Sequence, residues 1–184
     1  MMGRRIFYFL FFIFSGLGFS QTSEEGGSLS ELQKKYSDDH AVYLSEKEHV
    51  VINTKGNDFE IYSDVNWEIL YLSDKGRAYG DQNIQFSEFS EIQNIKAFSY
   101  IPKNGDTEKL KKTKVTEFKT EDVYDGSYFF HDNKQIAFRF PGSESGTKIN
   151  LAYREVIKKP QFLGSTFLMN YLPTLKSEYS ISYP

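Results

Sequence analysis

The sequence has 184 residues, of which 39% are hydrophobic and 26% charged, and its formal net charge is -3. This length predicts one globular domain of ordinary size. The chain has no cysteine and three histidines, which excludes thiolate nucleophiles, thiolate-bound metals and disulfides and leaves little for histidine-based chemistry. The composition therefore argues against most classes of enzyme.

The first twenty residues have the pattern of a secretory signal peptide. Arg4 and Arg5 precede an uncharged apolar run at residues 6–14, and small and polar residues follow. The run is too short to cross a bilayer, which takes about 20 apolar residues. We predict cleavage between Ser20 and Gln21, an exported protein that is periplasmic or secreted, and no membrane span in the mature chain. An uncleaved N-terminal anchor is the alternative.

Residues 21–37 are predicted to form a polar lead-in followed by one short helix. Residues 21–27 are polar and carry glycine, which favours a flexible segment. Ser28 and Glu31 have the spacing of a capping box at a helix start. The apolar residues of the predicted helix share one face: Leu29, Leu32 and Tyr36.

A long strand is predicted over residues 59–71, where apolar residues occupy alternate positions. The turn-forming tetrad at 55–58 joins it to a strand at 49–54 and predicts a hairpin. Because strands this long usually bend, we expect a β-bulge or a change of sheet near Ser63 and Asp64.

Further strands are predicted to follow, separated by turns that contain proline and glycine at 102–105 and 141–143. They cover residues 92–101, 114–120, 135–140, 147–158, 164–169 and 177–183. Short antiparallel strands with regular turn signals predict an all-β domain over residues 38–184, an antiparallel β-sandwich of immunoglobulin-like or related type. A closed barrel is the structural alternative.

The densest group of potential ligands for a hard cation lies between two of these strands. Its members are Asp122, Asp125, Gly126, His131 and Asp132. The spacing falls short of a calcium-binding loop, which needs more oxygen ligands at fixed places. A solvated turn is the favoured interpretation, and we predict no metal and no cofactor.

A run of lysines precedes this loop and consists of Lys109, Lys111, Lys112 and Lys114. Lysines commonly protect an exposed strand edge from pairing with other chains. Acidic neighbours at Glu108, Glu117 and Glu121 offset the charge. An edge strand is therefore the favoured interpretation, and an anion-binding patch is the alternative. Nucleic acid is not expected as a partner, because the mature chain is acidic and lacks a concentrated basic face.

Three consecutive aromatic residues, Tyr128, Phe129 and Phe130, are the candidate binding surface. Alternate residues of a strand face opposite sides, so at least one ring must leave the face that the others use. An exposed ring could stack on a sugar or anchor a peptide. Burial of all three in a sheet covered on both sides is the alternative, and Trp67 is predicted to lie in the core.

No catalytic residues are predicted. Carboxylates are plentiful, but none stand at a spacing that assigns acid and base roles. Residues 142–146 (GSESG) place glycines and serines close together, but a serine nucleophile needs a strand-to-helix turn with a partnering histidine. We therefore interpret this segment as a loop.

The order of the segments resembles the DUF3857 domain, a β-rich module that precedes a transglutaminase-like cysteine peptidase domain in exported bacterial proteins, mostly of the Bacteroidetes. The matching pieces are residues 41–44 (AVYL), 69–76 (ILYLSDKG), 95–97 (IKA) with 101–105 (IPKNG), 140–142 (FPG), 146–153 (GTKINLAY) and 171–173 (YLP) leading to 179–184 (YSISYP). The resemblance covers about residues 38–184.

What the resemblance implies is a sandwich-like accessory domain without catalytic residues of its own, in which Gly76 and Gly105 permit turn dihedrals. It further implies a C-terminal transglutaminase-like domain as a partner. This chain lacks the cysteine that such chemistry uses, so it is expected to be either a fragment of a larger protein or a free-standing module.

The expected function is thus that of a secreted, non-catalytic interaction or accessory module. The alternative is a free-standing module of the cell envelope that binds a polysaccharide or peptide. An autonomous hydrolase that uses carboxylates is a third, less favoured class.

Overall fold

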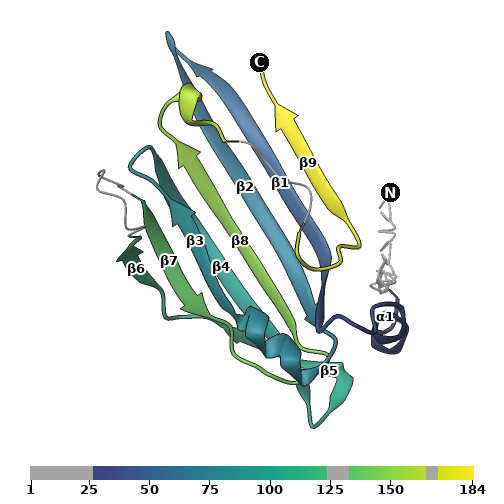
Figure 1. The fold of residues 1–184 in the computed structure, drawn as a ribbon. Helices are drawn as coiled ribbons and strands as arrows, with labels where there is room; N and C mark the ends of the chain where they lie inside the picture. The colour runs from purple at the N-terminus through teal and green to yellow at the C-terminus, as the bar shows by residue number, and fades with distance from the viewer. Residues whose placement is uncertain (1–26, 124–132, 165–169) are drawn as a thin grey trace, which may run out of the picture.

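The computed structural model describes residues 27–123, 133–164 and 170–184, and these form an α-helix, two 3₁₀ helices and nine strands (Figure 1). The helices are α1 (Leu29–Lys35), η1 (Asp74–Gly80) and η2 (Pro160–Phe162). The strands are β1 (Ala41–Lys55), β2 (Asp58–Tyr71), β3 (Asp81–Phe86), β4 (Ser90–Lys103), β5 (Asp106–Lys114), β6 (Lys119–Asp122), β7 (Lys134–Arg139), β8 (Lys148–Ile157) and β9 (Ser177–Ser182). No helix among these residues is long and apolar enough to cross a membrane.

The strands form two sheets, which confirms the all-β fold with one short N-terminal helix. A six-stranded sheet has the order β5-β4-β8-β2-β1-β9, and a three-stranded sheet has the order β3-β7-β6. The closed barrel is wrong, since both sheets end in open edges. The sheets are mainly antiparallel, as predicted, and one pairing departs from this, because β9 pairs with β1 in parallel. After β8 the chain passes across β2 and β1, and β9 then runs in the same direction as β8. Since β1 also runs in that direction, β9 and β1 are parallel.

The capping box predicted at the start of α1 is present. The Ser28 amide donates to the Glu31 carboxylate at 2.8 Å, and the Glu31 amide donates to the Ser28 hydroxyl at 3.4 Å. Leu32 is the buried residue of the helix and packs against Val42 and Leu70 on the outer side of the large sheet. The apolar face of this short helix therefore gives it a fixed place on the fold.

The hairpin of β1 and β2 forms as predicted, with Gly56 in the left-handed region at φ +65°. The bulge expected near Ser63 and Asp64 is absent from β2, which pairs in unbroken register with both neighbours there. The register shift lies in β1 instead, between Tyr43 and Ser45. Leu44 is the extra residue of this bulge, since Tyr43 pairs with Ile69 and Ser45 pairs with Glu68.

The lysine run lies in β5, at the edge of the six-stranded sheet, as predicted. The strand predicted over 114–120 is wrong, because β5 ends at Lys114 and β6 begins only at Lys119. In between, the Val115 amide still donates to the Ala97 carbonyl at 2.9 Å, and the chain then passes to the small sheet. Gly164 does not lie in a strand, and residues 165–169 lie outside the described residues.

The core lies between the small sheet and one end of the large sheet. Trp67 is 8% exposed and belongs to this core, as predicted. Its ring contacts Phe140, with the ring centroids 5.8 Å apart. The other buried members include Ile69, Tyr71, Ile84, Ala97, Ile136, Phe138, Ile149 and Leu151. They come from both sheets, so the small sheet covers this part of the large one.

Gly76 and Gly105 serve different needs. Gly105 has φ +78° and forms the turn between β4 and β5, as expected. Gly76 lies in η1 and is not among the glycines with positive φ. A Cβ at Gly76 would lie 2.7 Å from the His40 carbonyl oxygen and 2.7 Å from the Tyr71 Cβ. Close packing, and not a turn dihedral, therefore requires this glycine.

Candidate functional site

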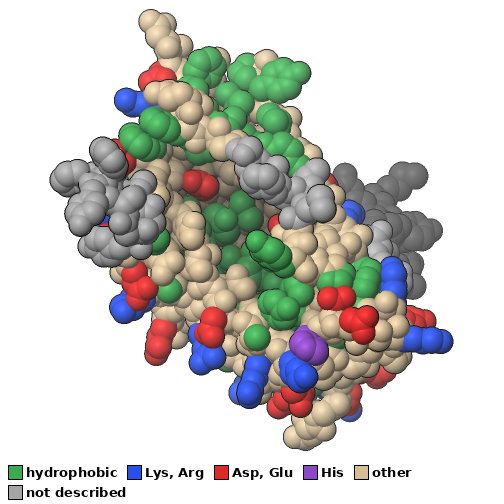
Figure 2. Space-filling view, in the orientation of Figure 1, with side chains coloured by type: hydrophobic (Ala, Val, Ile, Leu, Met, Phe, Trp, Pro, Cys, Tyr) green, Lys and Arg blue, Asp and Glu red, His purple; other side chains and the backbone are tan. Residues whose placement is uncertain are grey.

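The inner face of the large sheet is hollowed where the core ends. Figure 2 shows this region, over β8 and β2, as a recess floored by hydrophobic side chains with an acidic side chain at its wall. We call it the concave groove. Its residues face inward from three neighbouring strands by register: Glu46 and Glu48 on β1, Ser63 and Val65 on β2, and Tyr153 and Glu155 on β8.

Two of the carboxylates in the concave groove are held by hydrogen bonds. The Ser63 hydroxyl, which is 3% exposed, donates to Oε1 of Glu48 at 2.8 Å. The Asn170 amide donates to Oε2 of Glu46 at 2.7 Å. A charge in a half-buried place needs such partners, because they replace part of the lost hydration. The contacts therefore fix the direction in which these acids point.

Tyr153 lies among these acids on the floor of the groove. Burial raises the pKa of its hydroxyl well above the ordinary value, and the negative charges of Glu155, Glu48 and Glu46 raise it further. The hydroxyl therefore stays protonated into the alkaline range and can donate a hydrogen bond. A tyrosinate nucleophile or base is disfavoured in this environment.

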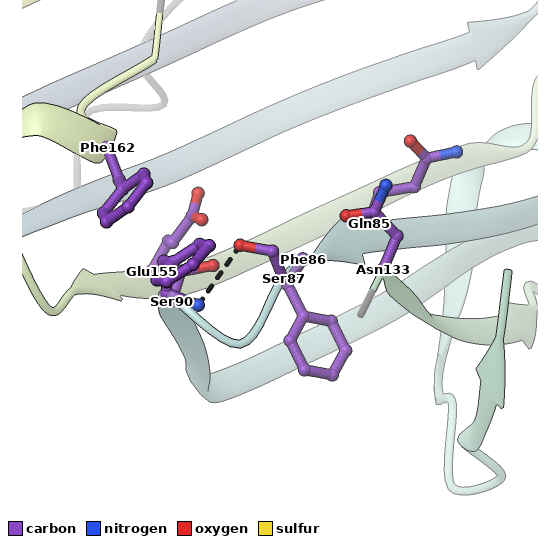
Figure 3. A pocket seen from close by; sticks show the side chains of 8 residues that line it. Gln85, Phe86, Ser87, Ser90, Asn133, Glu155 and Phe162 are labelled. Atoms are coloured by element: carbon purple, nitrogen blue, oxygen red, sulfur yellow. Dashed lines mark hydrogen bonds between the residues drawn. The ribbon is translucent and has the colours of Figure 1, made fainter. Parts of the chain in front are cut away.

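One end of the concave groove opens into a pocket of about 260 Å³ (Figure 3). The rings of Phe89 and Phe162 stack there, with centroids 3.8 Å apart and planes 9° apart. Glu155 lies beside this pair, so the pocket and the groove share one carboxylate. The remaining residues of the pocket are Gln85, Phe86, Ser87, Ser90 and Asn133.

The pocket is shaped by the turn between β3 and β4. The Phe89 amide donates to the Ser87 hydroxyl at 3.2 Å, and the Ser90 amide donates to the Ser87 carbonyl at 3.1 Å. η2 brings Phe162 against this turn from the end of β8, because its first residue, Pro160, starts a helical turn directly after the strand. Two segments far apart in the sequence thus form one aromatic wall.

The concave groove is suited to recognition. It offers carboxylate acceptors, a tyrosine donor and an aromatic wall, which together can bind a partner through hydrogen bonds, charge and ring contacts. In the part of the chain that the structure describes, no group of three or more histidine, aspartate or glutamate side chains is arranged to hold a metal ion.

The residues predicted from the sequence as a binding surface, Tyr128, Phe129 and Phe130, lie outside the described residues. The same is true of the predicted cleavage site at Ser20 and Gln21 and of most of the acidic loop. Asp122, the described member of that loop, ends β6 and is exposed. The segment at 142–146 is a loop, as predicted, and its Ser145 amide donates to Asp74 at 2.9 Å.

Sequence reasoning missed the acids of the concave groove. Glu46, Glu48 and Val50 alternate along β1 and therefore share one face of a strand, which is the signal that could have revealed the first two. Glu155 joins them only because β8 and β1 both flank β2. No spacing within the sequence relates residue 155 to residues 46 and 48.

Comparison with known proteins supports the fold and identifies the family. A crystal structure of a putative protease from Parabacteroides distasonis has a similar fold, with a TM-score of 0.62 and 15% sequence identity. The similarity covers 77% of this chain and 28% of that longer chain. No curated protein matches this sequence. The model of the family DUF3857, described as a domain of unknown function with a solved structure, matches residues 63–184, and the chain belongs to this family.

Proposed function

We propose that this chain is an exported, non-catalytic accessory module of a larger protein, in which a transglutaminase-like peptidase domain performs the chemistry. The observation that carries the proposal is the similarity to the Parabacteroides distasonis protein, of which this fold makes up 28%. A fold by itself does not assign a function. A fold found as a minor part of a chain described as a protease nevertheless supports an accessory role.

The chemistry of the concave groove is consistent with this role. Its acids lie around a tyrosine whose raised pKa keeps it protonated even at alkaline pH, and two of them are held by Ser63 and Asn170. Such an arrangement presents fixed donors and acceptors to a partner surface. The apolar leader at residues 6–14 supports export.

The test is the intact mass of the native product, captured from the source cell envelope with an antibody against residues 21–184. We expect a species much longer than this chain that begins at Gln21 and carries a cysteine-containing domain. A native species that ends at Pro184 would overturn the accessory role. A native species that begins at Met1 would overturn cleaved export.

Catalysis is tested separately with the purified domain and a panel of fluorogenic peptide and glycoside substrates. We expect turnover no higher than in buffer. Turnover that is lost in the Glu155→Gln variant and kept in Glu60→Gln would overturn the non-catalytic role and favour a carboxylate hydrolase. Glu60 is a matched control because it lies on the same sheet and makes a surface ion pair with Lys55 at 3.6 Å.

A second candidate function is a binding module for a polysaccharide or peptide of the cell envelope. The observation that favours it is the concave groove, where the stacked Phe89 and Phe162 rings stand beside Glu155. Trp67 reports on the groove, because it pairs with Glu46 across the β1–β2 ladder. Titration with envelope glycans and a lysine-containing peptide should change its fluorescence, and flat signals with all of them would contradict this function.

A further inference from the structure

A second cleft lies on the three-stranded sheet, away from the concave groove. It has a volume of about 660 Å³ and forms where the chain leaves β5 and enters β6 at Lys119. We call it the sheet cleft. Its lining residues come from β3, β6, β7 and the segment before β6: Asp81, Gln82, Asn83, Thr116, Glu117, Phe118, Lys119, Gln135, Ala137, Phe138 and Arg139.

The charges of the sheet cleft balance one another. Arg139 donates to both carboxylate oxygens of Asp81, at 2.9 and 3.0 Å. Lys119 pairs with Glu121 at 2.7 Å, which lowers the pKa of that carboxyl and raises the pKa of the lysine. Figure 2 shows acidic and basic side chains next to one another along this side of the molecule, over β6 and β7. A polyanion or polycation would therefore find no excess of opposite charge here.

The lining also contains neutral hydrogen-bonding groups, and two of its amides are held in place. The Gln82 amide donates to the Tyr79 carbonyl at 2.9 Å, and the Gln135 amide donates to Glu121 at 3.2 Å. Both bonds use the NH₂ group, so they orient the carbonyl oxygen of each side chain as an acceptor. Asn83 and Thr116 complete this polar lining.

One aromatic ring provides an apolar surface in the sheet cleft. Phe118 is 37% exposed, and it packs on the buried Phe138 with ring centroids 5.2 Å apart. The buried ring holds the exposed one in a fixed orientation. Ala137 is the small residue that β7 contributes to the lining, and it pairs with Lys119 at the start of β6.

From these features we propose that the sheet cleft binds an uncharged oligosaccharide. A sugar ring has an apolar face of C–H groups that packs on an aromatic ring, and an edge of hydroxyls that both donate and accept hydrogen bonds. Balanced charges, oriented amides and a half-exposed phenylalanine match both features. The inference goes beyond the second candidate function above, because it names one ligand class and a place of binding apart from the concave groove.

The test is a titration of the domain, residues 21–184, with cellotetraose, maltotetraose and chitotetraose, followed by amide chemical shifts in NMR. We expect at least one of them to shift the resonances of β3, β6 and β7. Truncation of Phe118 to alanine should weaken that binding by about tenfold, the equivalent of about 1.4 kcal/mol. Asn83→Ala, which removes an exposed amide and leaves the core intact, should weaken it by about threefold.

Phe162→Ala is the matched control, because this ring is 40% exposed but lies in the concave groove. We expect it to leave the affinity unchanged. Loss of binding in Phe162→Ala, with Phe118→Ala and Asn83→Ala unaffected, would overturn the sheet cleft as the site and support the groove instead. Shifts with none of the three oligosaccharides would overturn the inference and leave a peptide as the ligand of the second candidate function. Neither result bears on the accessory role, which the native mass decides.

Discussion

The two halves of the inner face of the large sheet differ in what covers them and in which side chains they carry. In the half under the small sheet, alternate positions of β2 are Trp67, Ile69 and Tyr71, all buried. In the half that forms the concave groove, the same strand continues with Ser63 and Val65 beside glutamates from β1 and β8. One strand thus carries large apolar side chains at one end and a polar stretch at Ser63 further along, and beyond it Ile61 on the same face is buried again with Val50 and Ile157. The comparison shows that strand alternation sets the face, whereas the packing around each position decides whether that position is apolar or polar.

Truncation in the covered half should have the largest effect. Trp67→Ala removes a large ring that contacts Tyr43 and Phe140 in the core. We expect the free energy of unfolding to fall by about 3 to 5 kcal/mol, because a cavity adds to the lost burial. Urea unfolding followed by circular dichroism measures it. The control Tyr183→Ala, at a residue that is 77% exposed, should change stability by at most about 0.5 kcal/mol, and equal losses in both variants would contradict the comparison.

Alkaline pH should lower the free energy of unfolding, because one tyrosine in each half, Tyr71 and Tyr153, loses its proton less readily in the folded state. Burial raises the pKa of Tyr71 to about 12, from an ordinary value of 10.0, and burial with nearby acids raises that of Tyr153 as well. The unfolded chain loses these protons first, so the stability they contribute is complete below pH 10 and is lost as pH rises through the folded-state values. For Tyr71 the loss amounts to roughly 2 to 3 kcal/mol.

Unfolding free energies measured from neutral pH to pH 12 should therefore fall in the native domain. The fall should be shallower in Tyr71→Phe and in Tyr153→Phe, since neither phenylalanine can ionise. An identical slope in the native domain and in both variants would show that these two tyrosines are not the groups responsible.

Overpacking of the covered half should cost less than a cavity. In Gly76→Ala the new methyl meets the His40 backbone carbonyl, which cannot move aside as a flexible side chain can. We expect a loss of about 1 to 3 kcal/mol. Lys75→Ala, one residue earlier and exposed, is the matched control in the same urea experiment, and a tolerated Gly76→Ala would refute the packing argument.

Removal of a charge from the open half should have the smallest effect on stability and a clear effect on titration. Three glutamates raise the pKa of Tyr153 through their negative charge, and the effect of Glu155 is the largest. Glu155→Gln should therefore move this pKa toward its ordinary value. We expect the free energy of unfolding to change by at most about 0.5 kcal/mol. Ultraviolet absorbance of tyrosinate during an alkaline titration detects the shift, and Glu60→Gln on the opposite face should leave it unchanged.

Much of the local structure could be predicted from residue patterns. The capping box at Ser28 and Glu31, the hairpin turn at Gly56 and the lysine-rich edge strand all follow from short-range rules, and the structure confirms them. Errors arose where a segment changes sheets. Val115 is apolar and is therefore predicted as part of a strand. In the structure it is buried, but β5 ends one residue earlier and β6 begins only at Lys119 in the small sheet.

The sequence by itself determined the fold class and the buried position of Trp67, because alternation and turn residues act over a few residues. Only the tertiary structure decided the parallel return of β9, the close contact that requires Gly76, and the meeting of Glu46, Glu48 and Glu155 around Tyr153. These features depend on which strands become neighbours, and strand order follows from the burial of the whole core and not from any local pattern.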